Sequence, residues 1–226
     1  MAKVSLAEHM KEHRTVQEQG LDEAGPFVTI SRQFGCYGFS LGLLLLDILN
    51  EETDGPSWQI YHKDILSRLA TETNLATEFL EHQRRSKPSA LVDFFRSLRK
   101  ERVPSGYEIR NRITTIIRGL AIEGHAIIIG QGGAVATRDL QNGLTIRLEA
   151  PEAWRVKQIA FREAINETEA KLRVRAKERE REYLRKLYET RQTRKPAFHL
   201  TYDCSAFSLA QIAQHIVSMM KLKKCF

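Results

Sequence analysis

Short apolar runs, separated by polar stretches that contain glycine or proline, predict a sheet of five strands. The run HAIII at 125–129 is the clearest of them, because a continuous apolar run is typical of a strand in a parallel sheet that is covered on both faces. The expected strands are residues 27–31, 58–61, 125–129, 144–148 and 200–204.

Helical spacing of apolar residues fills the segments between these strands. Pro151 is expected in the first turn of one helix, and Asn166 is expected to cap the next. The alternation of strands and helices predicts an α/β fold, in which a parallel sheet carries helices on both faces. The expected helices are 39–50, a mainly helical block at 64–123 with breaks at 88 and 104, a short helix after 134, and then 152–165, 166–191 and 208–221.

Length and composition allow one domain with a substantial core and room for a small inserted subdomain. Of the 226 residues, 42% are hydrophobic and 28% are charged, as in a soluble globular protein. The longest apolar run is 43–46, far short of the ~18 residues that suggest a membrane span. Residues 1–20 contain no apolar signal-peptide core, so we expect a cytoplasmic protein with no membrane partner. Three widely spaced cysteines support neither a disulfide framework nor a zinc site.

Positive charge is concentrated near the C-terminal third of the chain. The net charge of the whole chain is +7, and residues 171–195 alone carry eleven Lys/Arg and four Asp/Glu. A basic block of this kind can bind nucleic acid, a membrane surface or a small polyanion. The interleaved glutamates argue against a simple nucleic-acid arm; they are Glu178, Glu180, Glu182 and Glu189.

A glycine-bearing segment follows the first strand, where a phosphate-binding loop would begin. Gly35 and Gly38 stand between a strand and a helix, and such loops hold phosphate with backbone amides and a helix start. The lysine of the usual motif falls on Gly38, and its hydroxyl residue falls on Ser40. Without the lysine, the segment is equally compatible with a tight turn from strand to helix.

Five segments occur in one order and at consistent spacing: ISRQFGCYGFSLG, IYHKDIL, HAIIIGQGGA, LTIRLEAPEAWRVKQI and REREYLRKLY. Together they resemble the cytidylate kinase-like family, a branch of the P-loop nucleoside monophosphate kinases, over about residues 27–220. The resemblance implies a three-layer sandwich around a five-stranded parallel sheet. Members of this branch typically carry SR-Q/E-Y/F-G-S-G-G in place of the lysine motif, so the missing lysine is a property of the branch.

The chain is expected to divide into two parts. The polar, amphipathic pattern of residues 1–25 predicts an N-terminal helix or arm, and the resemblance implies a P-loop kinase-like domain over 26–226. Within that domain, a helical substrate-binding region covers about 74–123 and a basic helical lid covers about 166–195.

ATP and magnesium are the cofactors that the resemblance implies. Ser40 is expected to face the magnesium that accompanies ATP. Arg32 is a candidate to replace the missing lysine, and the alternative is that it forms a structural ion pair with a carboxylate. The residues expected to hold ATP are Arg32, Gly35, Cys36, Tyr37, Gly38, Phe39 and Ser40.

On the acceptor side, the resemblance assigns His62, Lys63, Asp64 and Gln131 to substrate binding. His62 departs from the aspartate that is usual in the branch, and the alternative is that residues 62–64 merely cap a helix. Gln131 stands where the branch commonly has an arginine, and an amide can form hydrogen bonds but cannot neutralise charge. The candidates to compensate are Arg110, Arg112 and Arg118, whose alternative is plain solvent exposure.

The basic helix resembles the lid of these kinases, which supplies arginines to the transferred phosphoryl group. Arginine suits this task because its planar fork binds two phosphate oxygens at once. The candidates are Arg179, Arg181 and Arg185, of which the last two are four residues apart and share a helix face. The alternative is a solvated helix in which most of the charges form Glu–Arg pairs.

The resemblance therefore implies an ATP-dependent kinase that acts on a small acceptor such as CMP or dCMP. One alternative is a catalytically impaired nucleotide-binding protein of the same fold, which the departures at His62, Gln131 and Ala206 favour. A further alternative is a nucleic-acid or anion-binding protein that uses the basic helix. We expect nucleotides as partners rather than nucleic acid.

Overall fold

The computed structural model describes residues 24–64, 106–188 and 198–226, and it contains a sheet of five strands that all run parallel. The strand order is β2-β3-β1-β4-β5, which places β1 at the centre and the strands that follow it on both sides. The α/β fold expected from the sequence is confirmed. The strands are β1 (Phe27–Arg32), β2 (Gln59–Tyr61), β3 (Ala126–Ile129), β4 (Gly143–Glu149) and β5 (Leu200–Asp203).

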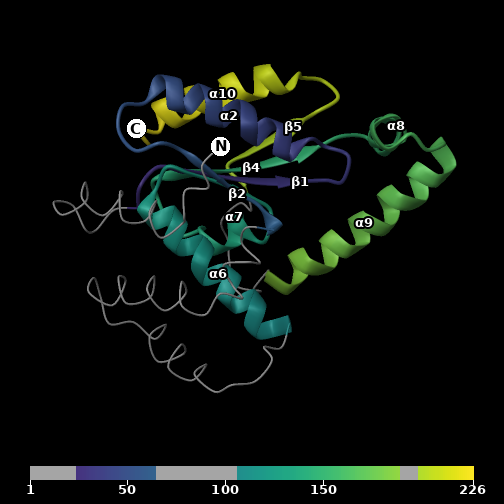
Figure 1. Ribbon diagram of the computed structural model, residues 1–226, viewed down its shortest axis with the longest axis horizontal. Helices are drawn as coiled ribbons and strands as arrows, with labels where there is room; N and C mark the ends of the chain where they lie inside the picture. The colour runs from purple at the N-terminus through teal and green to yellow at the C-terminus, as the bar shows by residue number, and fades with distance from the viewer. Residues whose placement is uncertain (1–23, 65–105, 189–197) are drawn as a thin grey trace, which may run out of the picture.

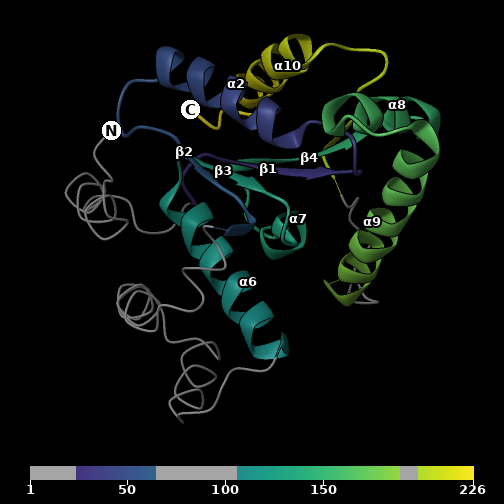
Figure 2. The same cartoon turned by 45° about the vertical axis from the view of Figure 1, so that its right-hand side comes forward.

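Helices form a layer on each face of this sheet, as Figures 1 and 2 show. The helices α2 (Gly38–Glu52) and α10 (Leu209–Leu222) cover one face, and α6 (Gly106–Glu123) and α7 (Gly133–Ala136) cover the other. The helices α8 (Glu152–Glu163) and α9 (Glu167–Tyr188) lie beyond the carboxyl ends of the strands. In an open parallel sheet, ligands bind in the crevice at that end, where the connections diverge.

The face under α2 and α10 is wholly apolar. Leu41, Leu45 and Leu49 recur every four residues along α2 and are fully buried against Ile30 and Ile129, among other strand residues. Burying each of these leucines stabilises the fold by about 2 kcal/mol. The strongly apolar face expected for this helix is therefore confirmed.

The opposite face is divided into an apolar and a polar part. Phe27 and Ile128 pack with Ile117 and Leu120 of α6 in a second core. Side chains alternate between the two faces of a strand, and the alternate residues of β1 and β4 that share this face are polar. They are Thr29 and Ser31 in β1 and Thr145, Arg147 and Glu149 in β4.

Several boundaries differ from those that the sequence predicts. His125 was predicted in the third strand but lies outside it, because its φ of 51° follows a φ of 88° at Gly124, and two left-handed residues form a turn rather than a strand. Pro151 occupies the N-cap of α8 rather than its first turn, whereas the cap at Asn166 is confirmed by a 2.9 Å hydrogen bond from the Glu169 amide to its side chain.

Some of the predicted segments lie outside the described residues. They are 1–23 of the N-terminal arm, 65–105 of the helical block and 189–195 of the lid. In the part of the chain that the structure describes, no helix combines the length and the apolar character needed to span a membrane.

Candidate functional site

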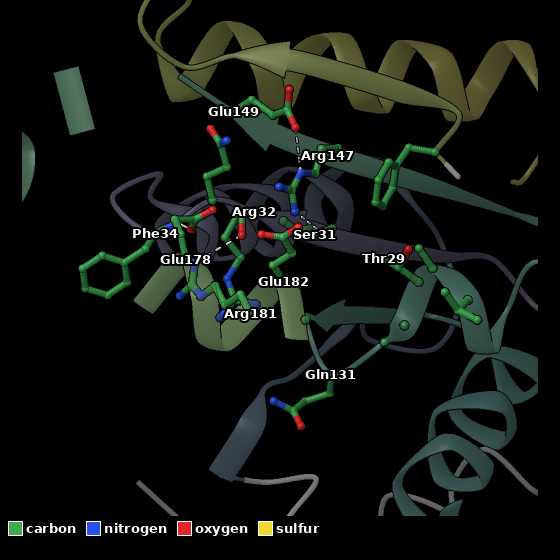
Figure 3. Close-up of a pocket in the computed structure, with 18 of the residues that line it drawn as sticks. Thr29, Ser31, Arg32, Phe34, Gln131, Arg147, Glu149, Glu178, Arg181 and Glu182 are labelled. Carbon is green, nitrogen blue, oxygen red and sulfur yellow. Dashed lines mark hydrogen bonds and ion pairs between the residues drawn. The ribbon is translucent and has the colours of Figure 1, made fainter. Parts of the chain in front are cut away.

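A cavity of about 800 Å³ opens at the carboxyl ends of the central strands, on the face that carries α6 and α7 (Figure 3). The ends of β1 and β4 and the loop after β3 form its walls together with one side of α9. Lys63 after β2 and Phe198 before β5 complete the lining. The cavity thus lies where the fold predicts a ligand site.

Arg32 enters this cavity from the end of β1, and two glycines leave space for its side chain. A Cβ atom at Gly38 would lie 3.0 Å from Arg32 Cδ, and a Cβ atom at Gly130 would lie 2.1 Å from Arg32 Nη1. A larger residue at Gly130 would therefore displace the guanidinium, and one at Gly38 would crowd the aliphatic part of the Arg32 side chain. Because Gly38 is the position of the usual lysine, the same glycine that removes the lysine also admits Arg32.

The guanidinium of Arg32 is held among other positive charges. Burial, together with the nearby cations Arg181 and Arg147, lowers its pKa to about 10. At pH 7 the group is still charged. Among the described residues, no carboxylate forms an ion pair with Arg32, so the alternative of a structural ion pair finds no support there. The cavity lining thus brings together Arg32, Arg147 and Arg181, alongside the carboxylates of Glu149, Glu178, Glu180 and Glu182.

Arg181 reaches the same cluster from α9. Its Nη1 donates a 3.1 Å hydrogen bond to the Arg32 carbonyl, and its guanidinium carbon lies 5.2 Å from the centre of the Phe34 ring. Burial lowers the pKa of Arg181, while Glu178 acts in the opposite direction. Of the three lid candidates, Arg181 alone is shown to line the cavity, because Arg179 is exposed outside it and the Arg185 side chain lies beyond the described part.

Glu178 joins α9 to the loop that follows β1. Its Oε1 accepts a hydrogen bond from the Phe34 amide and lies 4.0 Å from Arg155 Nη1. Arg155, from α8, also donates to the Phe34 carbonyl at 3.2 Å. A carboxylate of α9 therefore binds a backbone donor of the loop in which the sequence predicts phosphate binding.

The loop itself is folded as a tight turn. The Cys36 amide donates to the Gln33 carbonyl at 3.2 Å, and the Gly38 amide donates to the Cys36 carbonyl at 2.9 Å. Gly35 has a φ of 98°, and a Cβ there would lie 2.8 Å from Arg155 Cβ, so only glycine fits. Of the predicted ATP-binding residues, Arg32 lines the cavity; the others do not, namely Gly35, Cys36, Tyr37, Gly38, Phe39 and Ser40.

The acceptor-side candidates divide in a similar way. Lys63 and Gln131 line the cavity. His62 contacts Phe39 edge to face at 5.4 Å between ring centroids, and its Nδ1 accepts a 3.4 Å hydrogen bond from the Asp64 amide. His62 and Asp64 thus bond locally to each other, which agrees with the capping alternative.

The loop after β3 has an unusual backbone. Gly130, Gln131 and Gly132 have φ values of 77°, 54° and 76°, so all three residues are left-handed. Glycine adopts this region freely, but a residue with a side chain costs about 1–2 kcal/mol there. Such strain concentrates at functional sites. The nearby Arg118 does not compensate for Gln131, because it is paired with Asp139 at 2.8 Å and bound to the Ala136 carbonyl.

Arg147 is the residue of this site that sequence reasoning missed. It is only 8% exposed, its Nε donates to Glu149 at 3.1 Å, and its Nη1 donates to Ser31 at 2.9 Å. The segment LTIRL at 144–148 predicts a strand, and the polar alternation at 145, 147 and 149 is the signal that would have placed Arg147 on an open face.

Comparison with known proteins agrees with this architecture. The sequence model of the cytidylate kinase-like family matches residues 27–206, which is most of the chain. The chain belongs to this family. The match includes β1, the cavity loops, α9 and β5, and thus every residue of the arginine cluster.

Solved structures extend the comparison to the fold. A crystal structure of an uncharacterized protein from Eubacterium ventriosum superposes with a TM-score of 0.63 at 15% identity, covering 86% of this chain and 97% of that one. TT1252 from Thermus thermophilus gives a TM-score of 0.44 at 15% identity, over 88% of this chain and 98% of that one. No curated protein matches the sequence. At this identity the Eubacterium ventriosum structure supports the fold alone.

Proposed function

We propose that this protein transfers the γ-phosphoryl group of ATP to a small acceptor, by family resemblance a nucleoside monophosphate such as CMP or dCMP. The observation that carries the proposal is the cluster of Arg32, Arg147 and Arg181 in the cavity at the carboxyl ends of β1 and β4. Membership of a nucleotide-kinase family supports the same activity.

The chemistry fits what the cavity offers. Phosphoryl transfer depends on positioning and on charge stabilisation, and the acceptor phosphate is itself the nucleophile, so no general base is required. Arg32 from the central strand and Arg181 from the lid would contact the phosphates from two sides. Because Arg181 and Glu178 connect α9 to the loop after β1, closure of α9 would also exclude water.

Magnesium suits the donor set of the cavity. Mg²⁺ prefers oxygen ligands and is usually held by one or two carboxylates together with substrate phosphates. Glu149 and Glu182 line the cavity and would supply such carboxylates. Within residues 24–64, 106–188 and 198–226 no three metal-ligating side chains cluster, which agrees with a metal held largely by the nucleotide. Bound magnesium would neutralise phosphate charge. The assignment of Ser40 to magnesium remains a prediction.

The test is a turnover assay with Mg-ATP and a panel of nucleoside monophosphates, with nucleotide binding measured in parallel. Arg181→Ala is expected to reduce turnover by about 10²–10³-fold, the usual effect of losing one group that stabilises a developing charge. Arg179→Ala is the matched control, because Arg179 is an exposed arginine of the same helix, and its turnover should stay within about twofold of the unmodified protein. Equal effects of the two substitutions would contradict the proposal.

A second candidate function is nucleotide binding without catalysis, and the neutral Gln131 on the β3 side of the cavity favours it. Nucleotide binding without turnover on any acceptor would establish this alternative. The nucleic-acid alternative is weaker, since basic residues of α9 form ion pairs with glutamates; examples are Arg173 with Glu163, Arg175 with Glu152 and Lys177 with Glu180. Salt-sensitive nucleic-acid binding without nucleotide binding would favour it instead.

A further inference from the structure

The polar face of β1 and β4 forms the floor of the cavity. Strands of a parallel sheet that is covered on both faces are usually apolar throughout. Here Thr29 pairs in register with Thr145, and Ser31 pairs with Arg147. Thr145 is bonded to His199, with 3.1 Å between Thr145 Oγ1 and His199 Nδ1. The three remaining residues of these pairs, Thr29, Ser31 and Arg147, all line the cavity.

Thr29 contains a polar atom with no partner among the described residues. The residue is 1% exposed, and its Oγ1 has no hydrogen bond there. Its Cβ and Cγ2 face Gly133, where an added Cβ would lie 3.4 Å from each of them. An unpaired buried hydroxyl destabilises a protein, and valine would fill the same space without that penalty. Thr29 lines the cavity, so a ligand bound there would offer this hydroxyl a partner once the side chain turns toward it.

Arg147 is fixed in place before any ligand arrives. Its Nε is bonded to Glu149, its Nη1 to Ser31, and its guanidinium carbon lies 5.8 Å from the centre of the Phe198 ring. No described residue bonds to Nη2, so one edge of the guanidinium can still donate. Because Ser31 accepts from Arg147, the proton of its own hydroxyl is available to another acceptor.

These three groups match the chemistry of a phosphate monoester. Alternate residues of a strand lie about 6.6 Å apart, a separation that two hydroxyl donors span when they share one tetrahedral phosphate. Arg147 adds a positive charge with a fixed donor edge. Across the cavity, Gln131 carries no charge. A phosphate dianion is bound more strongly by a cationic side chain than by a neutral one.

We propose that Thr29, Ser31 and Arg147 bind the phosphate monoester of the acceptor, so that β4 supplies the charge that is absent at Gln131. This inference rests on the proposed function, because it identifies the acceptor end of the same cavity. It assigns Arg147 as a specificity-determining residue for acceptors that carry a terminal phosphate.

The test measures the binding of inorganic phosphate, of CMP and of a non-hydrolysable ATP analogue with magnesium, each by calorimetry. Thr29→Val is expected to weaken CMP and phosphate binding about tenfold while the melting temperature stays equal or rises. Arg147→Met should weaken both about a hundredfold, and Arg147→Lys should fall between, because lysine keeps the charge but cannot contact Ser31 and Glu149 together. The ATP analogue should bind Thr29→Val within about twofold of the unmodified protein, and it should not displace phosphate.

Thr115→Val is the matched control. Thr115 is buried in α6 outside the cavity and donates to the Asn111 carbonyl, so its replacement should leave all three affinities unchanged. Unchanged CMP and phosphate affinity in Thr29→Val and Arg147→Lys would overturn the inference. Displacement of phosphate by the ATP analogue, or failure of the unmodified protein to bind any phosphate monoester, would also overturn it.

The two proposals can fail separately. Binding of CMP that depends on Arg147, without turnover, would retain this inference and remove the proposed kinase activity. Turnover whose KM for CMP is unaffected by Arg147→Lys would retain the kinase activity and remove this inference.

Discussion

The two walls of the cavity differ in charge and in how they are held. On the wall formed by β4 and α9, Arg147 and Arg181 are each bonded to residues of other elements. On the wall formed by the ends of β2 and β3, Lys63 is exposed and Gln131 is neutral. The loop there is defined by its left-handed backbone rather than by side-chain bonds.

Under the proposed function, this difference indicates how a site that lacks residues of a motif would still bind phosphate. A phosphate responds to the total field in a cavity, so a cation can be supplied from a neighbouring element. Arg32 enters over Gly38, and Arg147 enters from β4 opposite Gln131. We propose that charge on one wall offsets its absence on the other, and the following substitutions test that proposal.

The largest effect is expected for Arg32→Met. Turnover should fall about 100-fold, because a group that stabilises phosphate charge is lost. Stability should rise by up to about 3 kcal/mol, since the pKa of Arg32 is lowered to about 10 and its charged form is disfavoured in the folded state at every pH below that value. Chemical denaturation at pH 7 measures the gain. Lys63→Met, at an exposed site on the opposite wall, is the control for stability and should leave stability nearly unchanged. A loss of stability in Arg32→Met would contradict the account.

A buried acid provides a comparison from outside the cavity. Burial raises the pKa of Glu123, at the end of α6, to about 7, above its usual value of 4.5. The folded state then binds more protons than the unfolded state between these values, so stability should fall as pH rises from about 4.5 to 7, by at most about 3 kcal/mol. Glu123→Gln should remove this slope in denaturation curves measured across that range. Glu51→Gln, at an exposed site in α2, should keep it, and a slope that persists in Glu123→Gln would assign the effect to another group.

Glu178→Gln is expected to have a smaller effect. The substitution removes a negative charge from the arginine-rich wall and keeps an oxygen to accept from the Phe34 amide. Binding of the ATP analogue should tighten about fivefold, because the repulsion between the Glu178 carboxylate and the phosphates of the analogue is lost. Glu180→Gln, in an exposed ion pair with Lys177, should change binding less. Weaker binding in Glu178→Gln would show that the Glu178 carboxylate favours binding of the ATP analogue, and it would contradict this prediction.

Gln131→Arg should have the smallest effect. If β4 already supplies the charge for the acceptor, a cation on the β3 wall should change the KM for CMP by less than about threefold. A hundredfold rise in turnover would show that the β3 wall lacks a positive charge that the reaction needs. That result would contradict the proposal that β4 supplies this charge.

The sequence predicted the apolar framework well. The strands and α2 follow from apolar runs and helical spacing, and the cap at Asn166 follows from residue type. Such features depend on neighbours in the chain, which a sequence displays directly.

The site was harder to predict because it depends on contacts between distant segments. The place of Arg32 is set by the space at Gly130, and Arg147 faces the cavity only because β4 pairs with β1 in the observed register. Family motifs pointed to Arg181, which lines the cavity, and to Ser40, which is exposed on α2, and both roles remain predictions.

The most direct measurement is a crystal structure with a bisubstrate analogue, in which a polyphosphate chain joins two nucleosides. We predict that its phosphates will lie between Arg32, Arg147 and Arg181, in the cavity beneath α9. A phosphate chain that contacts none of these arginines, or an analogue that does not bind, would contradict the account.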